Sequence, residues 1–193
     1  MQRVIALMVM CGLLSLFAGS YTPDLAHSQV GFSVKHMMVS KVPGKFDRYE
    51  GTVEFDEKAM RFTKLTATID AASINTDNER RDNHLRSADF FDVANHPDIT
   101  FEMTAYRGDA EGGTMEGRLT IRGVTKPVTL DVEIGGLVTD PWGNRRLGFS
   151  LGGKINRQDF GLSWNKLLET GGVVVGDSVK LIIDIEAIGK QAP

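Results

Sequence analysis

The sequence predicts an all-β protein: an eight-stranded antiparallel barrel with a short helix between two of its strands. Eight segments alternate apolar and polar residues with period two, the pattern of a strand with one buried face. Short turn-forming segments separate them, which favours antiparallel pairing of neighbours. Glycine makes up 21 of the 193 residues, which favours turns and strands over helices. Closure into a barrel removes exposed strand edges; a β-sandwich is the alternative.

Each alternating segment is expected to form one strand. The eight segments cover residues 29–38, 49–56, 64–70, 99–106, 114–122, 128–134, 147–155 and 179–186. Turn signals between them include Val42-Pro43-Gly44, Gly112-Gly113 and Gly171-Gly172, because glycine and proline favour turn backbones. The sequence shows no internal repeat and no linker, so residues 21–193 are expected to form one domain.

One segment departs from this alternation. Thr76-Asp77-Asn78-Glu79 has the spacing of a capping box, in which a threonine caps a helix and a glutamate follows three residues later. It predicts a short helix that runs to about Leu85. Asp82 and Arg86 would form an i,i+4 pair on it. We expect this helix to act as a charged lid or end plug.

Residues 1–20 have the three regions of a secretory signal peptide. Arg3 supplies a positive charge, Val4 to Phe17 is mostly apolar, and Ala18-Gly19-Ser20 offers the small residues that a signal peptidase requires. An uncleaved membrane anchor is the alternative, but this apolar run is shorter than the roughly 20 residues that span a bilayer. We expect cleavage before Tyr21 and a mature chain that is exported and has no transmembrane segment.

Composition excludes several functions. The formal net charge is −3, which argues against a general nucleic-acid-binding protein. Cys11 is the only cysteine and lies within the predicted signal peptide. The mature chain therefore has no thiolate for catalysis, for a disulfide or for a cysteine-ligated metal site.

Candidate catalytic residues are few. Asp82, His84 and Ser87 are the residue types of a hydrolase triad, but residues two apart on a helix point to different faces, so Asp82 would not orient His84. The four histidines show no metal-binding spacing. His36 falls on the apolar face of its strand. It is expected either to be a hydrogen-bonded interior histidine or to contact the polar head of a ligand.

The barrel interior is the remaining candidate site. An eight-stranded barrel is either filled by its side chains or holds one small ligand. The inward positions combine large residues such as Phe32 and Phe101 with small ones such as Gly51, Ala67 and Gly117. This mixture suits a tunnel for a long apolar ligand, and it also suits a tapering packed barrel.

Four ordered blocks of the sequence, which span about residues 21–188, resemble the YceI-like family of polyisoprenoid-binding proteins. The blocks are His27-Ser28-x-Val30-x-Phe32-x-Val34-x-His36-Met37 with Ser40-x-Val42-x-Gly44-x-Phe46; Ser73-Ile74-x-Thr76 with Arg81-Asp82-x-His84-Leu85-x-Ser87-x-Asp89-Phe90-Phe91-Asp92 and Pro97-x-Ile99-x-Phe101; Gly117-x-Leu119-Thr120-Ile121-x-Gly123-Val124-Thr125-Lys126-Pro127-Val128; and Gly148-Phe149 with Arg157-x-Asp159-Phe160-Gly161-Leu162.

The resemblance implies an extended, lipocalin-like barrel in the bacterial periplasm. It implies a binding protein rather than an enzyme, with no cofactor, that sequesters or carries a long-chain isoprenoid lipid such as a polyisoprenoid or a quinone tail. Resemblance and alternation together give these candidate lipid-binding residues: Phe32, Val34, His36, Met38, Phe46, Val53, Phe55, Ile69, Phe101, Met103, Gly117, Leu119, Ile121, Phe149, Leu151 and Phe160. A homodimer is left open.

Two alternatives remain at this stage. The first is a lipid-modifying enzyme that uses His36 or His84 as an acid or base. The second is a packed barrel with a structural or stress-related role, in which side chains fill the interior.

Overall fold

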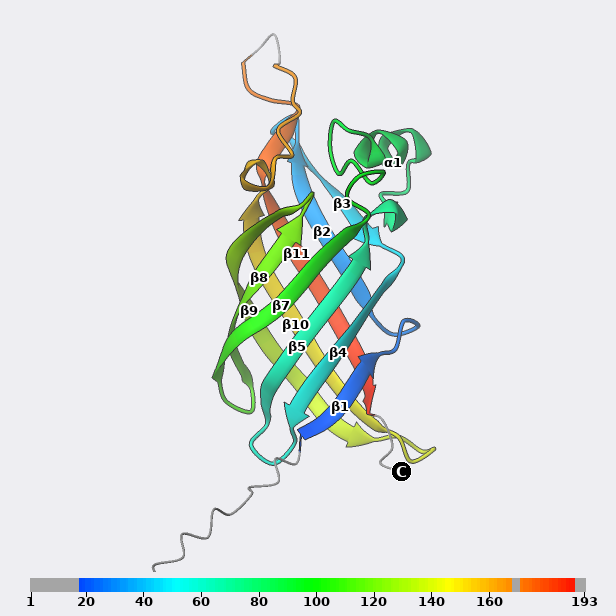
Figure 1. The fold of residues 1–193 in the computed structure, drawn as a ribbon, viewed down its shortest axis with the longest axis vertical. Coiled ribbons are helices and arrows are strands. Elements are labelled where there is room, and N and C mark those ends of the chain that lie inside the picture. Colours follow the sequence, from blue (N-terminus) through cyan, green and yellow to red (C-terminus); the bar gives the residue numbers. More distant parts are fainter. Residues whose placement is uncertain (1–17, 168–170, 190–193) are drawn as a thin grey trace, which may run out of the picture.

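The computed structural model describes residues 18–167 and 171–189 and shows an elongated barrel of tilted strands with one short α-helix at one end (Figure 1). The strands are β1 (Ala18–Pro23), β2 (Gln29–His36), β3 (Ser40–Phe46), β4 (Tyr49–Asp56), β5 (Arg61–Asp70), β6 (Ile74–Asn75), β7 (Asp98–Gly108), β8 (Gly112–Ile121), β9 (Val124–Thr139), β10 (Arg145–Asn156) and β11 (Val175–Gly189). The helices are α1 (Glu79–Arg86) and two 3-10 turns, η1 (Ala71–Ser73) and η2 (Arg157–Phe160). No helix in the described part of the chain is long and apolar enough to cross a membrane.

Eight of these strands form a closed ring. Their order is β1, β4, β5, β7, β8, β9, β10 and β11, and β11 pairs back onto β1. All of these pairs are antiparallel. The predicted class, an all-β eight-stranded antiparallel barrel with a short helix, is confirmed.

Strand β11 has two partners on the same side, one after the other. Its last residues pair with β1, where Ala187 lies opposite Pro23, and its middle pairs with β2, where Asp184 lies opposite Gln29. Residues 24–28 connect β1 to β2 across this change of partner. The ring therefore closes through β1, which the alternation did not predict, while β2, β3 and β6 extend the sheet beyond β11.

Strand β3 contains the segment that the sequence analysis assigned to a turn. Pro43 lies opposite Ser33 within the β2–β3 pair. The other edge of β3 pairs with β6 only at Lys45 and Phe46, so the missing N–H of Pro43 interrupts no ladder on that side. The reversal between β2 and β3 lies earlier instead, at Met37 and Met38, whose φ angles are 50° and 62°.

Strand β4 is paired on both sides for only half of its length. Its C-terminal half, from Val53 to Asp56, pairs with β1, and the whole strand pairs with β5. The segment Tyr49–Thr52 has β5 on one side and none of the described strands on the other. The barrel wall is therefore split between β4 and the loop that joins β1 to β2.

The N-cap of helix α1 lies two residues later than predicted. Asn78 is the N-cap, and its side chain accepts a hydrogen bond from the Arg81 N–H at 2.9 Å. Thr76 is buried, and its hydroxyl donates to the carboxylate of Asp82. The capping-box interpretation is therefore wrong. The helix caps one end of the barrel, opposite the end where β1 lies (Figure 1).

An apolar cavity as the candidate functional site

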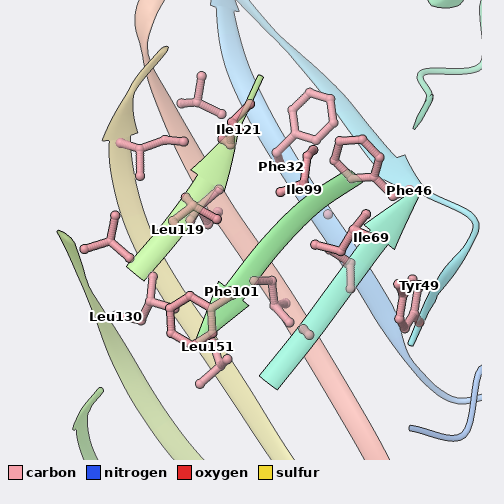
Figure 2. Close-up of a pocket in the computed structure, with 18 of the residues that line it drawn as sticks. Phe32, Phe46, Tyr49, Ile69, Ile99, Phe101, Leu119, Ile121, Leu130 and Leu151 are labelled. Carbon is pink, nitrogen blue, oxygen red and sulfur yellow. The ribbon is translucent and has the colours of Figure 1, made fainter. Parts of the chain in front are cut away.

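The barrel encloses a cavity of about 190 Å³ between its two ends. Figure 2 shows apolar side chains that converge on it from several strands, among them Phe32 on β2, Ile69 on β5, Phe101 on β7, Leu119 on β8 and Leu151 on β10. These residues face inward because side chains alternate between the two faces of a strand. The interior is therefore hollow in its middle and is lined by aliphatic and phenylalanine side chains.

The cavity has little polar chemistry to offer. Among the described residues, every buried side-chain nitrogen and oxygen has a hydrogen-bond partner within the protein. None of these atoms needs a hydrogen bond from a ligand, so a ligand in the cavity would be held by burial of its apolar surface. The site suits a long apolar chain and contains no acid–base pair.

Packed aromatic rings close the end of the cavity near β1, and we call this set the floor. Phe62 contacts the rings of Phe55, Tyr106 and Phe149 edge to face, with centroid distances of 5.1–5.2 Å. Phe62 is 1% exposed. Such pairs add about 0.5–1.5 kcal/mol each beyond the burial of their area.

Below the floor, Tyr21 is fully buried and donates a hydrogen bond to Glu57 at 2.6 Å. Arg145 also donates to Glu57, at 2.6 Å. Burial and then the Glu57 contact raise the pKa of the Tyr21 hydroxyl, so it stays a neutral donor. The hydrogen-bonded side chains of Tyr21, Glu57 and Arg145 close the floor from outside the cavity.

The opposite end is covered by α1 and its following loop together with η2 and the two residues after it, Gly161 and Leu162, and we call these segments the roof. Leu85, Phe90, Phe91 and Leu162 of the roof line the cavity. Arg157 lies beneath them, 4% exposed. Its five N–H groups make five hydrogen bonds, to the carbonyl oxygens of Leu162, Trp164, Val175 and Gly176 and to the carboxylate of Asp177. Its donors are therefore fully used by the protein and tie residues 162–164 and 175–177 to η2.

Two further arginines fix the roof to the barrel. Arg86 of α1 donates to the carbonyl oxygens of Ala72 and Ile74, at 2.7 and 2.8 Å. Arg122, in the turn between β8 and β9, donates to the carbonyl oxygens of Gly161 and Ala88, at 2.8 and 2.9 Å. The roof is thus held mainly by side-chain donors on backbone carbonyls.

Ten of the sixteen candidate residues line the cavity. They are Phe32, Val34, Phe46, Val53, Ile69, Phe101, Leu119, Ile121, Phe149 and Leu151. They lie on seven different strands, and the antiparallel ring brings them together around one space.

The other six do not line it, and Gly117 is the most informative of them. A Cβ built on Gly117 would lie 2.3 Å from the Phe101 ring, so that ring occupies the space that the sequence analysis assigned to a bound chain. Phe55 is fully buried in the floor, and Phe160 is buried in η2. Met103 packs against the core outside the cavity.

His36 and Met38 lie beyond the cavity at the end of β2. His36 pairs with Val175 and Ser40 and is half-buried. Met38 belongs to the β2–β3 turn and is 55% exposed, because the strand ends at His36. Neither side chain borders the cavity, so a contact between His36 and a ligand head stays a prediction that this cavity does not support.

His84 also lies outside the cavity. Its ring nitrogen Nε2 is 2.8 Å from the carboxylate of Asp89, and its ring lies edge-on to Phe90 and Trp164, at 5.1 and 4.8 Å. A chain held in the cavity would therefore reach neither of the two histidines that the enzyme alternative requires.

The sequence analysis missed two kinds of lining residue. Tyr49, Leu130 and the β11 side chains at 181, 183 and 185 line the cavity, and their alternation was a sufficient signal for all of them. The roof residues had no such signal, because a loop and a short helix carry no period that shows where they will dock.

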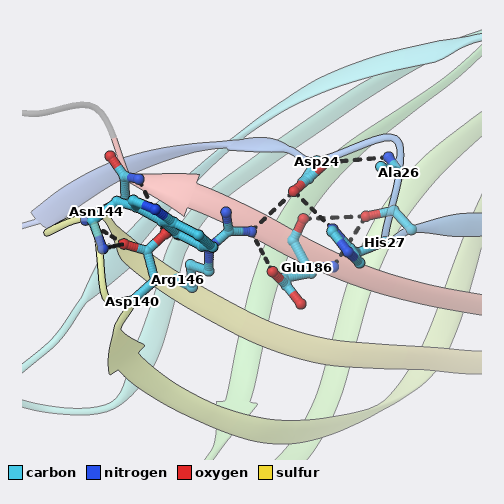
Figure 3. Close-up of polar contacts among 9 residues, drawn as sticks. Asp24, Ala26, His27, Asp140, Asn144, Arg146 and Glu186 are labelled. Atoms are coloured by element: carbon cyan, nitrogen blue, oxygen red, sulfur yellow. Dashed lines mark hydrogen bonds and ion pairs between the residues drawn. The ribbon is translucent and has the colours of Figure 1, made fainter.

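Besides the group of Tyr21, Glu57 and Arg145, the barrel has a polar cluster on its outside, around Arg146 (Figure 3). Arg146 donates to the carboxylates of Asp24, Asp140 and Glu186. Asp24, His27 and Glu186 bring metal-ligand atoms within 4.8 Å of one another. Because Arg146 binds two of these carboxylates, its guanidinium supplies the positive charge of the cluster, and the cluster fastens the β1–β2 loop to β10 and β11.

The fold and the cavity define a class: an antiparallel β-barrel that encloses one apolar, ligand-sized cavity. The comparison with known families is specific, since the YceI-like domain matches residues 21–187. The chain belongs to the YceI-like family.

Individual relatives agree with this assignment. UPF0312 protein SA2479 of Staphylococcus aureus strain N315 is 44% identical over 162 residues, which cover 83% of this chain and 92% of that protein. The YCEI protein of Campylobacter jejuni has a crystal structure with a TM-score of 0.72 and 43% identity, and the match covers 87% of this chain and 96% of that one. A structure described as a polyisoprenoid binding domain from Saccharophagus degradans has a TM-score of 0.65 at 16% identity, over 90% of this chain and 99% of that one, and shares the fold.

Proposed function

We propose that this protein binds one long-chain isoprenoid lipid, a polyisoprenoid or a quinone tail, in the cavity of the barrel and carries or sequesters it in the periplasm. The observation that carries the proposal is the apolar cavity with a closed floor and roof, together with the finding that no buried side-chain polar atom of the described residues lacks a hydrogen-bond partner. Burial of a chain contributes about 0.8 kcal/mol per CH₂ group, so affinity needs no catalytic or ionic group.

Two further points support the proposal. The Saccharophagus degradans domain with the same fold is described as polyisoprenoid-binding. In this chain, His36 and His84 lie away from the cavity, which favours a binding protein over a lipid-modifying enzyme. The bound lipid is then the only small molecule that the function needs, and no cofactor takes part.

A matched pair of variants on β9 tests the binding site. Val128 lines the cavity, whereas its neighbour Thr129 is exposed on the outer face of the same strand. Val128→Trp would place an indole ring in the space of the chain, and Thr129→Trp would add the same ring outside. Titration of the purified variants with geranylgeraniol, a C20 isoprenoid alcohol, measures the effect.

We expect Thr129→Trp to bind geranylgeraniol as the wild type does. We expect Val128→Trp to lose at least tenfold in affinity, because the ring and the chain compete for one space, and thermal melts show whether the variant is folded. Equal binding by two folded variants would contradict the proposed site, and so would a wild-type protein that binds no isoprenoid.

Export has its own test, because it is proposed from the signal peptide alone. Residues 1–17 lie outside the described part of the chain, and Ala18 to Ser20 form the first half of β1, opposite Asp56 to Glu54. We expect periplasmic protein to begin at or near Tyr21. Protein recovered from the cytoplasm with Met1 intact would contradict export.

A further inference from the structure

At the split in the barrel wall, the cavity and the outer surface come close to each other. A surface groove of about 430 Å³ runs over the unpaired half of β4. Six residues line both the groove and the cavity, namely Pro23, Tyr49, Glu50, Gly51, Thr66 and Ala67. We call the place where they meet the side slot.

The side slot is a built feature of the wall. On one side, the β1–β2 loop is fixed to β11: the Asp24 N–H donates to the carbonyl oxygen of Glu186 at 2.8 Å, and the Ser28 hydroxyl donates to the same oxygen at 3.1 Å. Arg146 holds the same loop through Asp24, at 2.9 Å (Figure 3). These contacts keep the loop on β11 and leave the upper edge of β4 uncovered.

The other side of the slot is thin because of Gly51. A Cβ built on this residue would lie 2.9 Å from the carbonyl oxygen of Thr66 and 3.7 Å from the Cβ of Ala67. A side chain at this position would therefore crowd β5. With glycine here, only backbone separates the cavity from the groove.

The polar end of an amphipathic chain has to stay in contact with solvent or with hydrogen-bond partners, because burying an unpaired hydroxyl is unfavourable. The floor is closed by rings such as Phe62, and the roof by buried residues such as Phe90 and Leu162. The side slot, by contrast, borders a groove that carries the hydroxyls of Thr22, Thr52 and Thr68.

We infer that the side slot is the head-group site of the proposed lipid, and that it takes an uncharged head with a hydroxyl group. This inference rests on the proposed function. Glu50 is the one charged residue among those that line the groove, and it is exposed. A carboxylate accepts a hydrogen bond from a hydroxyl, whereas it repels a phosphate or a diphosphate.

The charge of the groove can be reversed to test this preference. Glu50→Lys places a cation at the slot, and Glu54→Lys makes the same change on the same face of β4, about 13 Å farther along the strand and outside the groove. The two probes are geranylgeraniol and geranylgeranyl diphosphate, which share one C20 tail.

We expect wild-type protein to bind the alcohol more tightly than the diphosphate. Glu50→Lys should improve diphosphate binding by about tenfold and leave the alcohol within about threefold, since it replaces a repulsion between exposed charges by an attraction and the alcohol carries no charge. Glu54→Lys should change neither by more than about threefold. Equal effects of the two substitutions would overturn the inference, because the affinities would then depend only on the net charge of the protein.

A direct measurement of head position does not depend on these variants. A C20 isoprenoid chain with a nitroxide at its polar end should broaden the amide NMR signals of residues 50–52 and 66–68 more than those of Phe62 in the floor or Leu162 in the roof. Strongest broadening at either end would place the head there and overturn the inference while leaving the proposed function intact. A wild-type protein that binds neither prenyl compound would overturn both.

Discussion

The two ends of the cavity are closed by different physical means. The floor is an aromatic cluster on the strands themselves, in which Phe62 contacts three other rings. The roof consists of α1, its loop and η2, and it is held by arginines that donate to backbone carbonyls. The floor is therefore built from the strands themselves, whereas the roof is built from connecting segments that arginines attach to the barrel and whose apolar residues, such as Phe90 and Phe160, pack onto the same core.

This difference shows how one alternating pattern produces both a packed and a hollow region. In the floor, large inward residues of neighbouring strands meet one another. In the middle of the barrel, small residues such as Gly51 and Ala67 lie among larger ones, and Phe101 folds over Gly117 instead of crossing the interior. The order of large and small residues around the ring decides where space remains.

The largest expected effect is at the floor. Phe62→Ala should lower the free energy of unfolding by about 3–5 kcal/mol, because it opens a void among three rings. Leu181→Ala, at a half-buried position that already borders the cavity, should cost only about 1–2 kcal/mol. Urea unfolding of the two variants measures both. Equal costs would mean that the barrel is packed to the same density in both regions.

The roof should respond to the loss of a few side-chain hydrogen bonds. Thr76 accepts from Arg81 Nε at 2.7 Å and donates to the buried Asp82. Thr76→Ala should cost about 1–3 kcal/mol, since it leaves these groups short of a partner. Asn78→Ala, which removes the observed N-cap, should cost about 1 kcal/mol.

Hydrogen exchange locates the effect of the same roof variants. Both should speed exchange of the α1 amides without speeding exchange in β7 or β8, because the roof is attached separately. A uniform increase across the barrel would show that roof and floor unfold as one unit, which would end the distinction between them.

The smallest expected effect concerns the rim of the side slot and depends on pH. Hydrogen bonds from His27 and then Arg146 lower the pKa of Asp24 to about 2, whereas an unfolded aspartate titrates near about 3.9. This contribution to stability is present above about pH 4 and is lost as the pH falls towards 2. Thermal melts between pH 5 and 2 should show a shallower decline for Arg146→Met than for wild type. Arg118→Met, at an exposed pair with Glu102, should keep the wild-type slope.

The sequence predicted the barrel because period-two alternation reports which face of a strand is buried, and seven of the eight ring strands carry it. It did not predict β1, because Ala18-Gly19-Ser20 has the small residues of a cleavage site and little apolar alternation. The side slot could not be predicted from the sequence either, because it arises where β11 changes partners and not from any single segment.

The candidate site was predicted to the extent that strand faces determine it. Leu119 and Ile121 line the cavity as expected from alternation. Gly117 shares their face but does not line it, because the position of the Phe101 ring depends on a neighbouring strand. His36 follows the same alternation but lies past the end of the cavity, and alternation carries no information about where along a strand a cavity ends.

Native mass spectrometry of the protein, purified from cells without detergent, tests the central claim most directly. We predict that wild-type protein carries one apolar chain per molecule, identified as an isoprenoid after extraction, and that Val128→Trp carries much less of it while Thr129→Trp carries as much as wild type. Wild-type protein that is recovered without any chain, and that takes up none when geranylgeraniol is added, would contradict the account.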